Sequence, residues 1–127
     1  MIEPTALYTL TGALLILIGF AAIMLKRNLI KMMLGFVMVE AGVHLLIICF
    51  GYIPGRTAPI INAPDLLTDV AAMTAVPQQF VDPVVQAIVL TAIVIAVGVT
   101  ALMLAYVVRL YGVHKTLDVG RYVSLKW

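Results

Sequence analysis

Three long apolar runs alternate with short polar segments along the chain. The runs cover residues 5–25, 29–52 and 83–111. The first contains no charge over its 21 residues, and the third contains none from Val84 to Val108. About 20 apolar residues in a helix suffice to cross a bilayer core of roughly 30 Å. The pattern therefore predicts an all-α membrane protein with three transmembrane helices.

Local signals mark where these helices begin and end. Pro4 suits the first turn of a helix, where its missing N–H is not needed. Asn28 is a candidate N-cap for the second helix, and Asp82 followed by Pro83 is typical of an N-cap and a first helical residue. Gly112 is a candidate stop for the third helix. Because the first connection is very short, the first two helices are expected to be antiparallel neighbours.

Residues 53–82 form the one long connection, which prolines interrupt repeatedly. Apolar residues at helical spacing after Asp65 predict a short surface helix over residues 65–74. Residues 112–127 form a polar and basic tail. Since the three runs fill most of the length, we expect a single integral membrane domain over residues 1–127.

The composition agrees with a membrane protein and excludes several other classes. The chain is 64% hydrophobic and 11% charged, whereas soluble domains average about 45–50% apolar and about 25% charged residues. A lone cysteine, Cys49, rules out an intrachain disulfide. The opening residues lack the basic region of a signal peptide, so the first run is expected to be retained. No metal-ligand spacing, phosphate loop or nucleophile triad is present, and we expect no metal, cofactor, nucleic acid or self-contained enzyme activity.

The basic residues predict the orientation in the membrane. Seven of the eight lie on one side of the predicted bundle, and Arg56 lies on the other. By the positive-inside rule, the first connection and the C-terminus are cytoplasmic, while the N-terminus and the long connection are outside. The expected location is the cell membrane, crossed several times. The seven are Lys26, Arg27, Lys31, Arg109, Lys115, Arg121 and Lys126.

The second run carries a carboxylate where hydrocarbon is expected. After Lys31 its only charged residue is Glu40, near the middle. Insertion scales put an Asp, Lys or Arg at that depth at roughly 2.5–3.5 kcal/mol, so ionisable groups there are rare and usually face protein or water. His44 follows four residues later and shares a helical face with Glu40. Two interpretations stay open: stations on a proton or ion path, or polar contacts that hold helices together.

Small residues predict where helices approach one another closely. In the first run Gly12 and Gly19 lie two turns apart, and in the second Gly35 and Gly42 lie on the face opposite Glu40. The third run carries a stripe of small residues that comprises Ala87, Thr91, Gly98, Ala101 and Ala105.

Polar side chains inside the third run are expected to be structural. These are Gln86, Thr91 and Thr100. A threonine hydroxyl inside a helix ordinarily bonds to a carbonyl of the preceding turn.

The passage from Pro77 to Leu102 resembles the third span of the C subunit of Mrp-type sodium/proton antiporters. The resemblance rests on Asp-Pro at 82–83, Gln-Ala at 86–87 and Leu-Thr-Ala-Ile-Val-Ile at 90–95. The second run is also similar: Asn-Leu at 28–29 leads into Gly35, and Val-His-Leu-Leu at 43–46 stands where the family often has Val-Asn-Leu-Leu. The family is in turn similar to the K chain of respiratory complex I and to the equivalent subunit of archaeal membrane-bound hydrogenases and sulfane reductases.

The resemblance implies a small helical subunit among other hydrophobic subunits, lining a lateral hydrophilic path for H⁺ or Na⁺ and holding no redox centre. Two departures stand out. The K chains place membrane carboxylates at positions that align with Val37 and about Val99, which are apolar here. Glu40 lies one turn from the first of these, on the same face, and His44 replaces the usual Asn.

The expected function is therefore that of a subunit in the ion-translocating module of a Na⁺/H⁺ antiporter or of a related respiratory complex. The alternative is a structural or assembly subunit that bridges larger transport subunits without conducting ions. The three-run topology and the proline-broken connection argue against a small autonomous exporter or a proton-driven rotor.

Overall fold

The computed structural model describes residues 4–58, 60 and 80–122, and long α-helices dominate these ranges. They are α1 (Pro4–Leu25), α2 (Leu29–Gly51) and α5 (Pro83–His114), followed by a short 3-10 helix η1 (Val119–Arg121). Each of the three α-helices is long and apolar enough to cross a membrane. The prediction of an all-α membrane protein with three spanning helices is confirmed. The short helix predicted over residues 65–74 lies outside the described residues.

The three start signals are confirmed. α1 begins at Pro4. The Asn28 side chain accepts a hydrogen bond from the Ile30 N–H at 3.0 Å, and the Asp82 side chain accepts one from the Val84 N–H at 2.9 Å. Each cap satisfies a backbone donor that has no partner within its helix.

The end of α5 differs from the prediction. Gly112 lies inside the helix, which continues to His114. The chain leaves the helix at Lys115, which adopts a left-handed conformation with φ 53° and donates its N–H to the Tyr111 carbonyl at 2.8 Å. With 32 residues α5 is about 48 Å long, whereas α2 with 23 residues is about 35 Å long. The predicted stop was wrong because a glycine permits a helix to end without requiring it.

Beyond Lys115 the chain turns back toward the connection between α1 and α2. The Leu29 N–H donates to the Leu117 carbonyl at 3.0 Å, and the Val119 N–H donates to the Arg27 carbonyl at 2.9 Å. These backbone bonds hold the end of α5 close to the start of α2.

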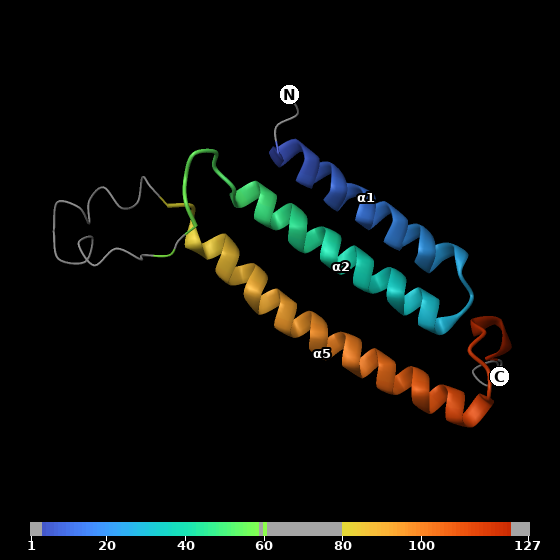
Figure 1. The fold of residues 1–127 in the computed structure, drawn as a ribbon. Helices are drawn as coiled ribbons and strands as arrows, with labels where there is room; N and C mark the ends of the chain where they lie inside the picture. Colours follow the sequence, from blue (N-terminus) through green and yellow to red (C-terminus); the bar gives the residue numbers. More distant parts are fainter. Residues whose placement is uncertain (1–3, 59, 61–79, 123–127) are drawn as a thin grey trace.

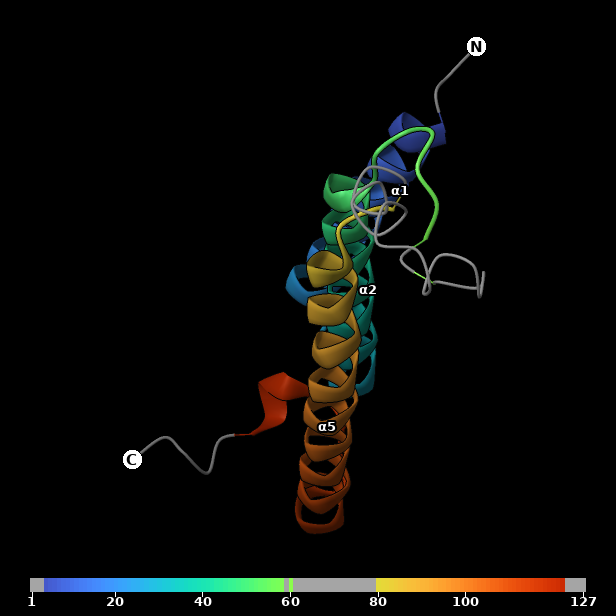
Figure 2. The same ribbon diagram turned by 90° about the vertical axis from the view of Figure 1, so that its left-hand side faces the viewer.

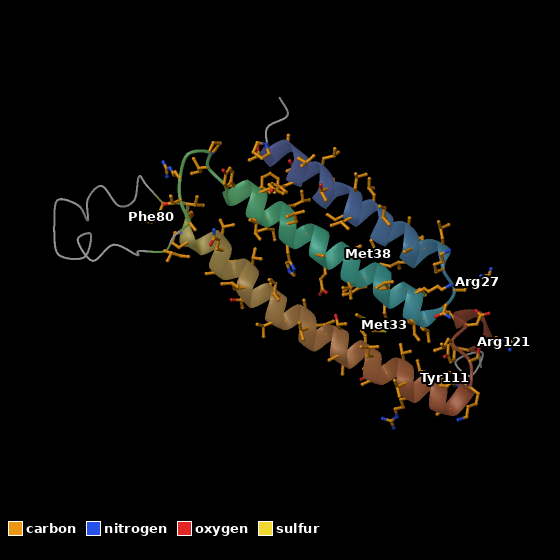
Figure 3. All side chains as sticks on the ribbon, in the orientation of Figure 1. Arg27, Met33, Met38, Phe80, Tyr111 and Arg121 are labelled. Atoms are coloured by element: carbon orange, nitrogen blue, oxygen red, sulfur yellow. The ribbon has the colours of Figure 1, made fainter. Side chains whose placement is uncertain are left out.

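The same end of the molecule gathers basic side chains. Figure 3 shows Arg27 and Arg121 close together there, and Phe80 at the opposite end. At that opposite end, the Val81 N–H donates to the Thr57 carbonyl at 3.0 Å. The described ends of the long connection are therefore joined beside the start of α5.

The three helices lie side by side in one layer, with α2 between α1 and α5 (Figure 1). Figure 2 views this layer along its row of helices, so that α5, α2 and α1 overlap. A single layer encloses little interior. The buried apolar side chains of the described residues are Met33, Val81, Val89 and Val107, and no polar or charged residue among them is buried.

Large apolar side chains cover the outside of the layer. Phe50 is 83% exposed and Leu25 is 77% exposed. Apolar surface on this scale is typical of a face that contacts lipid or other membrane proteins.

Candidate functional site

Four glycines bring α1 and α2 into close contact, and we call them the glycine seam: Gly12, Gly19, Gly35 and Gly42. All four are buried, and Gly12 faces Gly42 while Gly19 faces Gly35. A Cβ added at Gly19 would lie 2.6 Å from the Gly35 carbonyl oxygen, and one added at Gly35 would lie 2.8 Å from the Gly19 carbonyl oxygen. Because backbone atoms occupy these positions, a larger residue requires the helices to separate.

The glycine seam fixes which way α2 faces. At 100° per residue, Glu40 lies about 200° around the helix from Gly42. With the seam turned toward α1, the opposite face of α2 is turned toward α5. Residues of α2 and α5 that line one groove, Glu40 among them, are consistent with this arrangement.

A groove of about 400 Å³ lies between α2 and α5, and we call it the α2–α5 groove. At about 30 Å³ per molecule, this volume corresponds to roughly a dozen waters. Its polar side chains are Glu40, His44 and Thr100, and the rest of the lining is apolar. The full lining comprises Val37, Glu40, Ala41 and His44 from α2, and Ile93, Ala96, Val97, Thr100, Ala101 and Leu104 from α5.

Glu40 lines the groove at the middle of α2. It is the twelfth of the 23 residues of α2, and both Glu40 and His44 are half-buried. Among the described residues, neither side chain makes a hydrogen bond or an ion pair, and none of their polar atoms is sealed away without a partner. The two residues share the groove, as their spacing predicted, but they do not bond to each other. Their hydrogen-bonding capacity is available to whatever fills the groove.

Val37 lines the same groove one turn before Glu40. The resemblance aligned Val37 with a membrane carboxylate of the K chains. If Glu40 takes the place of that carboxylate in this chain, the carboxylate therefore stays in the same groove. Val99, the second aligned position, is 39% exposed and lies outside the groove lining.

The two threonines of α5 behave differently. The Thr91 hydroxyl donates to the Ala87 carbonyl at 3.0 Å, as predicted for a structural threonine. Thr100 lines the groove, and within the described part of the chain its hydroxyl makes no hydrogen bond. The prediction that Thr100 bonds back to its own helix was wrong.

The small-residue stripe of α5 faces away from the groove at two of its positions. Within the described residues, a Cβ added at Gly98 would meet nothing within 4 Å, and Thr91 is exposed. The predicted packing role of Gly98 and Thr91 therefore concerns a neighbour outside this chain, and it stays a prediction.

A close contact between the end of α2 and the start of α5 had not been predicted. A Cβ added at Gly51 would lie 2.7 Å from Cγ1 of Val85, so α2 and α5 approach closely there. Gln86 is half-buried beside this contact, on a small cavity of about 30 Å³. A signal was present, because Gly51 continues the three- and four-residue spacing of His44 and Ile47 along one face.

Comparison with known protein families identifies the family of this chain. The family described as NADH-ubiquinone/plastoquinone oxidoreductase chain 4L matches residues 7–127, and the chain belongs to this family.

Two relatives of the chain are named as subunits of antiporters. The chain is 30% identical over 115 residues to the C subunit of a Na⁺/H⁺ antiporter of Alkalihalophilus pseudofirmus, covering 91% of each chain. It is 39% identical over 108 residues to the putative antiporter subunit mnhC2 of Staphylococcus aureus, covering 80% of this chain and 84% of the relative.

A solved structure shares the fold. The chain is similar, with a TM-score of 0.75 and 39% identity, to a chain in the structure of the membrane-bound sulfane sulfur reductase, an archaeal respiratory membrane complex. The match covers 90% of this chain and 94% of that chain. The resemblance drawn from the sequence is confirmed.

Proposed function

We propose that this chain is a small subunit of the ion-translocating membrane module of a multisubunit Na⁺/H⁺ antiporter or of a related respiratory complex. In this proposal the α2–α5 groove is part of a lateral hydrophilic path. One observation carries it: Glu40 and His44 face a groove of about 400 Å³ at the middle of α2, and neither has a partner among the described residues.

The chemistry of the groove suits the transfer of protons. A carboxylate can accept a proton from one water and release it to another, and the imidazole of His44 one turn away can do the same. Ionisable groups placed inside membranes are typical of such relays. The glycine seam supports this role by holding α2 in one orientation against α1.

The relatives support the choice of ions and partners. Two of them are named as subunits of antiporters, one explicitly for Na⁺ and H⁺, and a third belongs to a respiratory membrane complex. We infer that the chain works among other hydrophobic subunits as one integral domain, and that H⁺ and Na⁺ are the ions moved. The exposed apolar faces of the layer are suited to such neighbours.

We further propose that the N-terminus faces outward and that the basic end of the bundle is cytoplasmic, in the cell membrane. The distribution of exposed charge supports this orientation, since cytoplasmic segments are enriched in Lys and Arg. Arg56 lies at the opposite end, within the long connection, where its N–H donates to the Ile53 carbonyl. The exposed basic residues of the cytoplasmic end are Lys26, Arg27, Lys31, Arg109, Lys115 and Arg121.

Replacement of Glu40 tests the proposal. We expect Glu40→Gln to abolish most cation/proton exchange in vesicles that hold the complete complex, because the amide keeps the shape but cannot carry the proton. Glu40→Asp, which keeps the carboxyl group, is expected to retain part of the exchange. A native gel checks that both complexes are intact. Unchanged exchange in an intact Glu40→Gln complex would remove Glu40 from the path.

The second candidate function is that of a bridging subunit through which no ion passes. The single-layer fold favours it, because both broad faces of the layer are free to contact larger subunits. Under this alternative, Glu40 variants lose assembly, and every assembled complex exchanges ions at the normal rate.

A further inference from the structure

Thr100 departs from the pattern that Thr9, Thr11 and Thr91 follow in the membrane helices. The Thr11 hydroxyl donates to the Leu7 carbonyl at 2.8 Å, and the Thr91 hydroxyl donates to the Ala87 carbonyl at 3.0 Å. The Thr9 hydroxyl likewise donates to the Thr5 carbonyl. Such bonds to the preceding turn satisfy a hydroxyl without help from outside the helix. In the part of the chain that the structure describes, the Thr100 hydroxyl has no such bond.

The position of Thr100 indicates what its hydroxyl can bind. Thr100 is half-buried and lines the α2–α5 groove, where the polar side chains opposite it are Glu40 and His44. The remaining groove residues of α5 are apolar, so Thr100 supplies the polar side chain on that wall. Its hydroxyl oxygen is not fully buried.

A hydroxyl that is free at this point can bind the same water before and after that water exchanges a proton. It offers one donor and two acceptor sites, so it can hold a water while that water donates to a carboxylate or accepts a proton from an imidazolium. The hydroxyl itself neither gains nor loses a proton in this exchange. An apolar wall cannot orient water in this way.

We propose that Thr100 is a positioning residue of the ion path, whose hydroxyl orients the groove water that exchanges protons with Glu40 and His44. This inference rests on the proposed function of the groove. It adds that the path is built from both helices, with the ionisable groups on α2 and the water-orienting group on α5.

The test uses the complete complex in membrane vesicles. Thr100→Val keeps the shape of the side chain and removes the hydroxyl, and Thr100→Ala removes it without adding bulk. We expect each to slow proton exchange by about three- to tenfold at unchanged assembly, the loss that corresponds to one hydrogen bond. Thr100→Ser, which keeps a hydroxyl, is expected to restore the rate. Thr91→Val is the matched control, because its hydroxyl is already bonded to the helix backbone, and it should leave the rate unchanged.

The pH dependence of exchange separates positioning from packing. Water-orienting hydroxyls affect proton delivery, so Thr100→Val and Thr100→Ala should both alter the pH profile, and Thr100→Ser should restore it. Normal rates and profiles in both hydroxyl-free variants, in a complex whose exchange still requires Glu40, would overturn the inference and leave the proposed function standing. Normal exchange in Glu40→Gln as well would overturn both.

Discussion

The two sides of α2 differ in how closely the neighbouring helix approaches. On the side of α1, the glycine seam brings backbone against backbone, and a Cβ added at Gly42 would lie 2.8 Å from the Gly12 carbonyl oxygen. On the side of α5, the helices stand far enough apart to leave a groove of about 400 Å³ with Glu40 and His44 on its wall. One helix therefore carries a closed contact and an open polar groove on opposite faces.

This difference shows how a small membrane protein can hold a charge in a defined place. A polar group inside a membrane is costly unless its surroundings are arranged for it. The glycine seam supplies fixed backbone contacts, so α2 cannot easily rotate and turn Glu40 into lipid. The groove supplies the space for water. Each side needs the other for the proposed function.

The strongest test of the seam is the smallest possible substitution. We expect Gly19→Ala to cost about 1–3 kcal/mol, the usual penalty for overpacking a tight contact, because the new methyl group meets the Gly35 carbonyl oxygen and the Val39 N–H. The thermal midpoint of the protein in detergent and the yield of intact complex should both fall. A stable Gly19→Ala protein would mean that the two helices are not held as closely as described.

The groove side predicts an effect on transport rather than on folding. We expect His44→Leu to lower exchange about tenfold, the size of one lost hydrogen bond between the imidazole and groove water, while assembly remains normal. His44→Asn, which keeps hydrogen bonding and matches the residue that the resembling family often has, should retain most of the activity. Equal activity in all three proteins would remove His44 from the groove's function.

Gly51 sharpens the comparison because it is a close contact on the groove side. Here an added Cβ meets Cγ1 and Cβ of Val85 rather than main-chain atoms. The Cγ1 methyl group can turn away, and a small shift of α5 relieves the contact with Cβ. We therefore expect Gly51→Ala to change the thermal midpoint much less than Gly19→Ala. A loss as large as that of Gly19→Ala would show the contact between Gly51 and Val85 to be as rigid as the seam.

Gly112→Ala should have the smallest effect and serves as the control for both. Within the described residues an added Cβ meets nothing within 4 Å there, and the position is inside α5. We expect an unchanged or slightly raised thermal midpoint, by at most about 1 kcal/mol of stability. A marked loss would reveal a contact of α5 that lies outside this chain.

The helices and their first turns were predictable because the signals are local. Twenty or so apolar residues define a span, and the side chains of Asn28 and Asp82 cap the residues that directly follow them. The faces of α2 were also predictable, since periodicity alone places Glu40 opposite Gly42. The path of the chain after Lys115, back toward the start of α2, was not predictable. It depends on backbone bonds from Leu117 and Val119 to residues about ninety positions earlier, and no side-chain pattern encodes them.

The role of Thr100 could not be predicted for a related reason. Thr91 and Thr100 are the same residue type in the same apolar run, and either hydroxyl could bond to a carbonyl one turn back. Their spacing of nine residues places them on opposite faces of α5, but only the neighbouring helix shows which face borders the groove: Thr100 faces α2, whereas Thr91 is exposed.

The most direct test of the central claim, that one face of α2 borders water and the other does not, is thiol accessibility. Ala41 lies on the groove and Val39, two residues earlier in α2, lies at the glycine seam, so Ala41→Cys and Val39→Cys form a matched pair at similar depth, each made with Cys49 replaced by Ala in the complete complex. A charged thiosulfonate requires water to reach and ionise a thiol, and we predict that it labels Ala41→Cys at least about tenfold faster than Val39→Cys. Equal and slow labelling at both positions would contradict a hydrophilic path in the α2–α5 groove.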